Sequence, residues 1–122
     1  MRYLLMIYSQ ESAGGPPPES IEGIKSAHAA VMREAAQKGV LLGVEGLKPT
    51  SMATSVRMKN GDPLILDGPF AETKEQLAGF YMMECKDLDE AIEWAKRIPT
   101  SCKGGEGCIE IRPIADLKRP AA

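Results

Sequence analysis

The chain has 122 residues and a mass of 13.2 kDa, enough for one hydrophobic core, and we expect a single domain over residues 1–122. Its 15 basic and 17 acidic side chains give a formal charge of -2 without any Lys/Arg cluster, which argues against a nucleic-acid partner. No apolar run approaches the roughly 20 residues of a membrane-spanning helix. The short apolar start does not resemble a secretion signal. The composition therefore predicts a cytoplasmic protein with neither a nucleic-acid nor a membrane partner.

The cysteines and glycines predict no cofactor site. Cys85, Cys102 and Cys108 are odd in number and lack CxxC spacing, which argues against a disulfide framework and against a zinc site. Cys102 and Cys108 could pair under oxidation, but free thiols are the expected state in the cytosol. The glycine-rich segment 104–107 precedes a strand, so it lacks the helix N-terminus of a phosphate-binding loop. We therefore expect no metal and no nucleotide or other cofactor.

The first third of the chain predicts a strand and a long helix. Residues 2–8 are apolar on both alternating sets, which is typical of a strand covered on both faces. A loop rich in Gly and Pro leads to Ser20, a candidate N-cap, and to a helix over residues 21–38 that ends at Gly39. The apolar stripe of this helix is Ile21, Ile24, His28, Val31 and Ala35.

The middle of the chain predicts strands joined by a tight turn. Residues 41–47 suit a strand that Gly43 and Gly46 weaken. Residues 52–66 suit a hairpin around Asn60-Gly61, which favours a type I′ turn, with Pro63 keeping the returning strand at an edge. Asp67-Gly68-Pro69 then breaks the strand, and residues 71–76 favour one or two helical turns.

The last third predicts a strand, a helix and a final strand. Residues 77–85 carry large apolar groups on both sides. Asp87 and Glu90 form a capping box for a helix that ends at Pro99. Its apolar stripe is Leu88, Ala91, Ile92, Ala95 and Ile98. A strand over residues 108–114 follows, and residues 115–122 are expected to form a flexible tail.

The order of these elements predicts an α+β fold, a ferredoxin-like split βαβ arrangement with an inserted β-hairpin. Two helices then lie on one face of an antiparallel sheet. Since two helices cover only one face and two strands are apolar on both sides, we expect a second copy of the chain to cover the other. The prediction is thus a homodimer.

With these residues the chain resembles the YCII-related family, and specifically its branch with the Asp-Gly-Pro-Phe (DGPF) motif, which stands here at residues 67–70. The likeness also includes the opening MRYLLMIY, residues 39–41, 45–47 and 87–91, and the closing 110–113. It implies a ferredoxin-like domain that pairs into a dimer through its sheet, most members being bacterial and cytoplasmic without an assigned reaction. In the broader family a His and Asp pair in a cleft has been proposed as an active site, and dehydrochlorination occurs in at least one branch. The transferable candidates here are His28 and Asp67.

Three residues are candidates for acid/base catalysis. His28, the single histidine, has an ordinary pKa near 6.5 that suits a general acid or base, or it is a semi-buried packing residue. Asp67 follows an edge strand, where a carboxylate can cap the turn, face a pocket, or do both. Glu45, between two glycines, could complete a carboxylate pair with Asp67 or lie at the surface.

Three further residues are candidates for ligand binding. The backbone amides around Gly68 could bind an oxyanion, and Phe70 lies in the same Gly-Pro-Phe loop. Lys74 could bind an anionic ligand or belong to a solvated, charged turn with its neighbours. We therefore expect a small molecule in a cleft between the first helix and the sheet. If the protein is an enzyme, cofactor-independent elimination or isomerisation is expected, as in a lyase or isomerase. The alternative is a non-catalytic binding or regulatory module that acts through its dimer surface.

Overall fold

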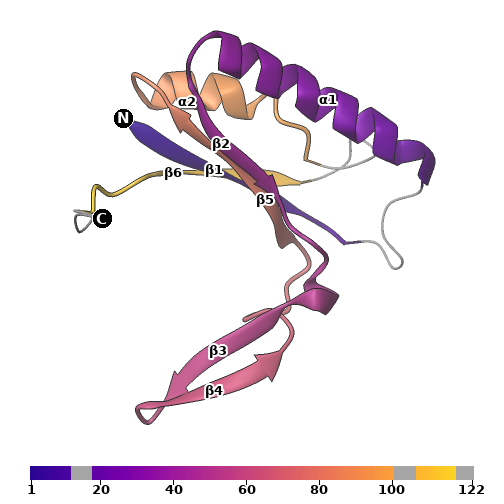
Figure 1. Ribbon diagram of the computed structural model, residues 1–122, viewed down its shortest axis with the longest axis vertical. Coiled ribbons are helices and arrows are strands. Elements are labelled where there is room, and N and C mark those ends of the chain that lie inside the picture. Colours follow the sequence, from indigo (N-terminus) through magenta and orange to yellow (C-terminus); the bar gives the residue numbers. More distant parts are fainter. Residues whose placement is uncertain (12–17, 101–106, 118–122) are drawn as a thin grey trace, which may run out of the picture.

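Strand β1 lies inside a four-stranded antiparallel sheet of order β2-β5-β1-β6. The structure is a computed structural model, and it describes residues 1–11, 18–100 and 107–117. Helices α1 and α2 lie on one face of this sheet (Figure 1). The strands are β1 (Arg2–Ser9), β2 (Leu41–Gly46), β3 (Thr54–Lys59), β4 (Asp62–Asp67), β5 (Gln76–Glu84) and β6 (Cys108–Pro113), and the helices are α1 (Pro18–Gln37), α2 (Leu88–Ala95) and the 3-10 turn η1 (Thr50–Met52). This arrangement confirms the predicted α+β fold.

The core lies between the sheet and the two helices. Because side chains alternate along a strand, Tyr3, Leu5 and Ile7 of β1 face the helices together with Tyr81 and Met83 of β5. The helices contribute Val31, Ala35, Ala91, Trp94 and Ala95. Ile98 from the segment after α2 and Cys85, directly after β5, complete the core. The core thus fills one face of the sheet.

The opposite sheet face is also apolar. Leu4 pairs with Met82 and Met6 pairs with Phe80, so these four side chains and Tyr8 point away from the helices. They are partly buried by one another, but no described helix or strand covers them (Figure 1). These five residues together form a surface named here the open sheet face.

Helix α1 begins at Pro18, one turn earlier than predicted, because proline is tolerated in the first turn of a helix. Ser20 therefore lies inside the helix and is not its N-cap. Gly39 ends the helical region with a φ of 71°, as expected for a C′ glycine.

In α2 the side chain of Asp87 accepts a hydrogen bond from the Glu90 amide at 2.9 Å, as predicted for an N-cap. Leu88 was expected in the buried stripe, but it is half exposed, whereas Trp94, which was not in that stripe, is buried. The regular helix ends at Ala95, before the expected Pro99.

The hairpin β3–β4 forms a two-stranded sheet of its own and projects away from the helices (Figure 1). Both turn residues have positive φ, 52° for Asn60 and 84° for Gly61, which agrees with the predicted type I′ turn. The helical turn expected over residues 71–76 is absent. Instead, the Gln76 side-chain amide donates to the carbonyls of Ala71 and Thr73, and so short a helix would not offset its nucleation cost.

Some expectations lie outside the described residues, namely those for Cys102, for the glycine-rich segment up to residue 106, and for the tail beyond residue 117. Within the described end of the chain, Arg2 forms an ion pair with Asp116 at 3.0 Å. None of the described helices combines the length and the apolar character needed to traverse a lipid bilayer.

Candidate functional site

A cavity of about 560 Å³ lies between α1 and one end of the sheet. Most of its lining is apolar, with a few polar groups. The lining residues are Ile7, Ser9, Ile24, His28, Met32, Val44, Glu45, Gly46, Leu47, Ala78, Gly79, Tyr81, Pro99 and Thr100. A concave, mainly apolar space with a few convergent polar groups is the usual form of a small-molecule site.

The polar centre of this cavity is a pair formed by His28 and Tyr81. The Nδ1 atom of His28 lies 2.7 Å from the Tyr81 hydroxyl, so the two side chains share a hydrogen bond. Their rings also stack, with centroids 5.9 Å apart and an interplanar angle of 24°. His28 comes from the inner stripe of α1, and Tyr81 comes from the core-facing side of β5. The described residues offer no hydrogen-bond partner to the second ring nitrogen of His28, Nε2.

Burial sets the protonation of both side chains. It lowers the pKa of His28, so the imidazole is neutral at neutral pH. It also raises the pKa of Tyr81 to about 12, so the phenol keeps its proton. A neutral imidazole and a neutral phenol can exchange donor and acceptor roles, because the hydroxyl proton rotates and the imidazole has two tautomers.

The structure separates the other two catalytic candidates from His28. Asp67 ends β4 on the projecting hairpin, where it pairs with Thr54, and it does not line the cavity. Glu45 does border the cavity, but it pairs with Phe80, which places its carboxylate on the open sheet face. Neither carboxylate is therefore the hydrogen-bond partner of the imidazole.

The ligand-binding candidates also lie away from this cavity. Gly68 has a φ of 104°, and its amide donates to the carbonyl of Ala53, so this amide already has a partner. Phe70 is 76% exposed and lies against Arg57 of the hairpin. Lys74 is exposed in the segment between β4 and β5. None of the three borders the cavity beside His28.

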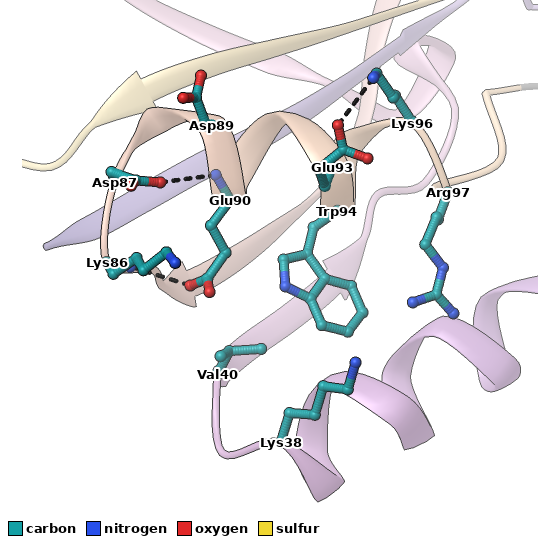
Figure 2. Close-up of a pocket in the computed structure, with 10 residues that line it drawn as sticks. All are labelled: Lys38, Val40, Lys86, Asp87, Asp89, Glu90, Glu93, Trp94, Lys96 and Arg97. Atoms are coloured by element: carbon teal, nitrogen blue, oxygen red, sulfur yellow. Dashed lines mark hydrogen bonds and ion pairs between the residues drawn. The ribbon is translucent and has the colours of Figure 1, made fainter.

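A second, more open cavity of about 650 Å³ lies between the end of α1 and α2 (Figure 2). Trp94 forms its floor, with Lys38 and Arg97 over the indole ring at 5.7 and 4.9 Å from its centroid. Most of its other lining side chains are charged, and several pair with one another. Its lining includes no histidine, cysteine or hydroxyl side chain, so it offers no thiol or hydroxyl nucleophile and no histidine for catalysis.

Metal ligation finds no support in the described chain, since no three His, Cys, Asp or Glu side chains there lie close enough to share an ion. Of the described cysteines, Cys85 is buried and Cys108 is exposed, and both are free thiols. Burial raises the pKa of Cys85 to about 11, so this thiol stays protonated and unreactive.

Sequence reasoning missed Tyr81, although a signal was present. A tyrosine inside a strand that is apolar on both sides needs a partner for its hydroxyl. On the helix stripe that faces this strand, the polar side chain is His28. Together these two observations predict Tyr81, and not Asp67, as the hydrogen-bond partner of His28.

Comparisons with known proteins identify the family of this chain. The chain is 38% identical over 119 residues to an uncharacterized protein of Rhizobium meliloti (strain 1021), an alignment that covers 97% of this chain and 95% of that protein. The YCII-related domain matches residues 1–118. A match over nearly the whole length shows that this chain belongs to the YCII-related family.

Proposed function

We propose that the protein binds a small, mainly apolar molecule with one polar group in the cavity beside His28. The observation that carries this proposal is the hydrogen bond of 2.7 Å between His28 and Tyr81 in a wall that is otherwise mostly apolar. A buried polar pair in apolar surroundings favours a ligand whose own polar atom reaches Nε2 of His28.

We further propose that this pair transfers a proton without a cofactor, as in elimination or isomerisation. When the Tyr81 hydroxyl accepts from Nδ1–H, the Nε2 atom of His28 holds a lone pair and removes a proton from a carbon acid. When the hydroxyl donates to Nδ1, Nε2 carries the proton and donates it to the ligand. Tyr81 is thus the positioning residue that selects the tautomer, and His28 is the catalytic residue.

The experiment is deuterium exchange at the acidic carbon of small apolar ketones, such as acetophenone, followed by NMR in heavy water. This assay detects proton removal without requiring a leaving group. His28→Gln should abolish the exchange, and Tyr81→Phe should reduce it and shift its pH profile. Lys25→Gln, on the exposed side of α1, is the matched control and should leave the exchange unchanged.

Two outcomes separate the readings. The parent protein could bind ketones saturably without catalysing exchange, and His28→Gln could weaken that binding. This result would refute the catalytic step and support a non-catalytic binding module. Neither binding nor exchange by any ketone or by the corresponding small carboxylic acids would refute the proposal for this cavity.

We also propose that the chain forms a homodimer in the cytoplasm, with the open sheet face buried against a second copy. Leu4, Met6 and Phe80 are central to this apolar face, and no described element covers them. This surface supports the alternative function, a regulatory module that acts through its dimer. Sedimentation tests it: Leu4→Glu should dissociate the dimer, whereas Leu88→Glu, a half-exposed leucine on the helical layer, should not. A parent protein that is monomeric at micromolar concentration would refute pairing.

A further inference from the structure

The projecting hairpin has two different faces, which the strand register defines. Val56 pairs with Ile65 and Met58 pairs with Pro63, so these side chains share one face, called here the outer arm face. Arg57 pairs with Leu64 and lies on the reverse side. The remaining residues of the reverse side are Ser55, Lys59, Asp62 and Leu66.

The reverse side is partly covered by the chain itself. Arg57 donates a hydrogen bond to the carbonyl of Phe70 at 2.6 Å, and its guanidinium lies 5.8 Å from the centroid of the Phe70 ring. The Ser55 hydroxyl donates to the carbonyl of Gly68 at 2.7 Å. Leu64 on this side is accordingly only 41% exposed. The DGPF segment therefore holds one side of the hairpin.

The outer arm face has no such cover. Val56, Met58 and Ile65 are 64%, 67% and 69% exposed. Their exposed fractions leave an apolar patch on the order of 400 Å², the size of the largest patch on a typical monomer, which is often functional. A two-stranded hairpin is at best marginally stable in water without a packing partner. The DGPF segment supplies such packing on the reverse side only, so a partner on the outer arm face would stabilise the hairpin further.

We propose that the outer arm face packs on a second copy of this chain, so that the two protomers exchange their hairpins across a two-fold axis. The inference rests on the proposed dimer and adds a contact that the open sheet face does not supply. The hairpin projects from the sheet on the side away from the helices, which is the side where the open sheet face would receive a partner (Figure 1).

The surface area that such an exchange would bury is that of a stable dimer interface. Two reciprocal arm contacts, each burying about 400 Å² of arm and a similar area of the partner, remove roughly 1,600 Å² from solvent, the size of a standard specific interface. The charge near the hairpin turn also favours a protein partner over a membrane or a nucleic acid. Lys59 and Asp62 pair across the strands and cancel, so this end has no net charge to attract a membrane or a nucleic acid.

The first test compares two neighbouring residues on opposite sides of β3. Met58→Glu places a charge on the outer arm face and should weaken the dimer at least tenfold in sedimentation equilibrium. Lys59→Glu places the same side chain on the reverse side and should leave the dimer unchanged. Far-ultraviolet circular dichroism and the fluorescence of the single tryptophan, Trp94, check that both variants are folded.

The second test locates the contact directly. A photo-crosslinking phenylalanine analogue replaces Ile65, and in a matched sample it replaces Lys59. Irradiation of the Ile65 sample should yield a covalent dimer, with the attachment mapped by mass spectrometry to the second chain. The Lys59 sample should yield much less.

The outcomes distinguish the arm from the sheet. A dimer that Leu4→Glu dissociates but Met58→Glu does not, together with no crosslink between chains from position 65, would overturn the arm exchange and leave pairing through the open sheet face. A parent chain that stays monomeric would overturn both the hairpin exchange and the pairing through the open sheet face. A different protein would then have to cover the outer arm face.

Discussion

Gly79→Ala tests the close approach of β2 and β5 beside the cavity. A Cβ atom on Gly79 would lie 2.7 Å from the carbonyl oxygen of Glu45 and 3.2 Å from the Cα atom of Gly46. Both contacts are with backbone, which cannot rotate away as a flexible side chain would. The two strands must therefore move apart.

The expected cost follows from three terms. Overpacking a core position costs about 1–3 kcal/mol, and weakening a backbone hydrogen bond between the strands adds about 1 kcal/mol. Replacing glycine by alanine returns about 0.5–1 kcal/mol by restricting the unfolded chain. The net loss in the free energy of unfolding is about 2 kcal/mol.

The assay is urea unfolding at a fixed protein concentration, followed by the fluorescence of Trp94. With a slope of about 1–3 kcal/mol per molar urea, the midpoint should fall by about 1 M. Gly43→Ala is the matched control, because it makes the same change in the adjoining strand β2 where a Cβ atom meets nothing within 4 Å. It should leave the midpoint unchanged or raise it slightly. Equal stability of the two variants would show that the strand contact at Gly79 is not the reason for glycine there.

Further predictions concern titration and helix capping. Because burial raises the pKa of Tyr81 from 10.0 to about 12, stability present below pH 10 should be lost as the pH rises to 12, by up to about 3 kcal/mol. Urea unfolding of Tyr81→Phe should show no such loss of stability at alkaline pH. The same alkaline loss in Tyr81→Phe and in the parent protein would contradict the role of the Tyr81 hydroxyl. Because burial lowers the pKa of His28, the unfolded chain binds more protons below pH 6.5, so the free energy of unfolding should fall as the pH drops below that value. His28→Gln should remove this dependence of the unfolding free energy on pH. An acid-side stability profile in His28→Gln equal to that of the parent protein would refute the prediction. Asp87→Ala should cost about 1 kcal/mol in thermal or urea unfolding because it removes the cap of α2, and a loss under a few tenths would show that the cap contributes little.

Local patterns were sufficient to predict most of the fold. Hydrophobic periodicity predicts β1, α1 and β5, and Asn60-Gly61 predicts the hairpin turn, because each signal depends on residues close in sequence. The same reasoning failed for residues 71–76. Their composition favours a helix, but the Gln76 side chain bonds the loop carbonyls instead, and such a contact has no sequence signature.

The candidate site was predicted in part. His28 is placed at the cavity, as the stripe of the first helix indicated, but its hydrogen-bond partner is Tyr81 and not a carboxylate. That pairing spans 53 residues and depends on how α1 lies over β5, which no local pattern specifies. Asp67 was linked to His28 because the family resemblance implies a His and Asp pair in a cleft. The hairpin forms a separate sheet, and this moves Asp67 away.

The strand order has a consequence for how the protein folds. Strand β1 is central, yet both of its neighbours, β5 and β6, come from the second half of the chain. Every pairing of β1 therefore closes a loop of more than half of the molecule, and such non-local contacts slow folding. During synthesis β1 stays unpaired until β5 emerges, with both of its apolar sides exposed. The chain should fold late and all at once, and in that interval β1 is the segment most prone to aggregation.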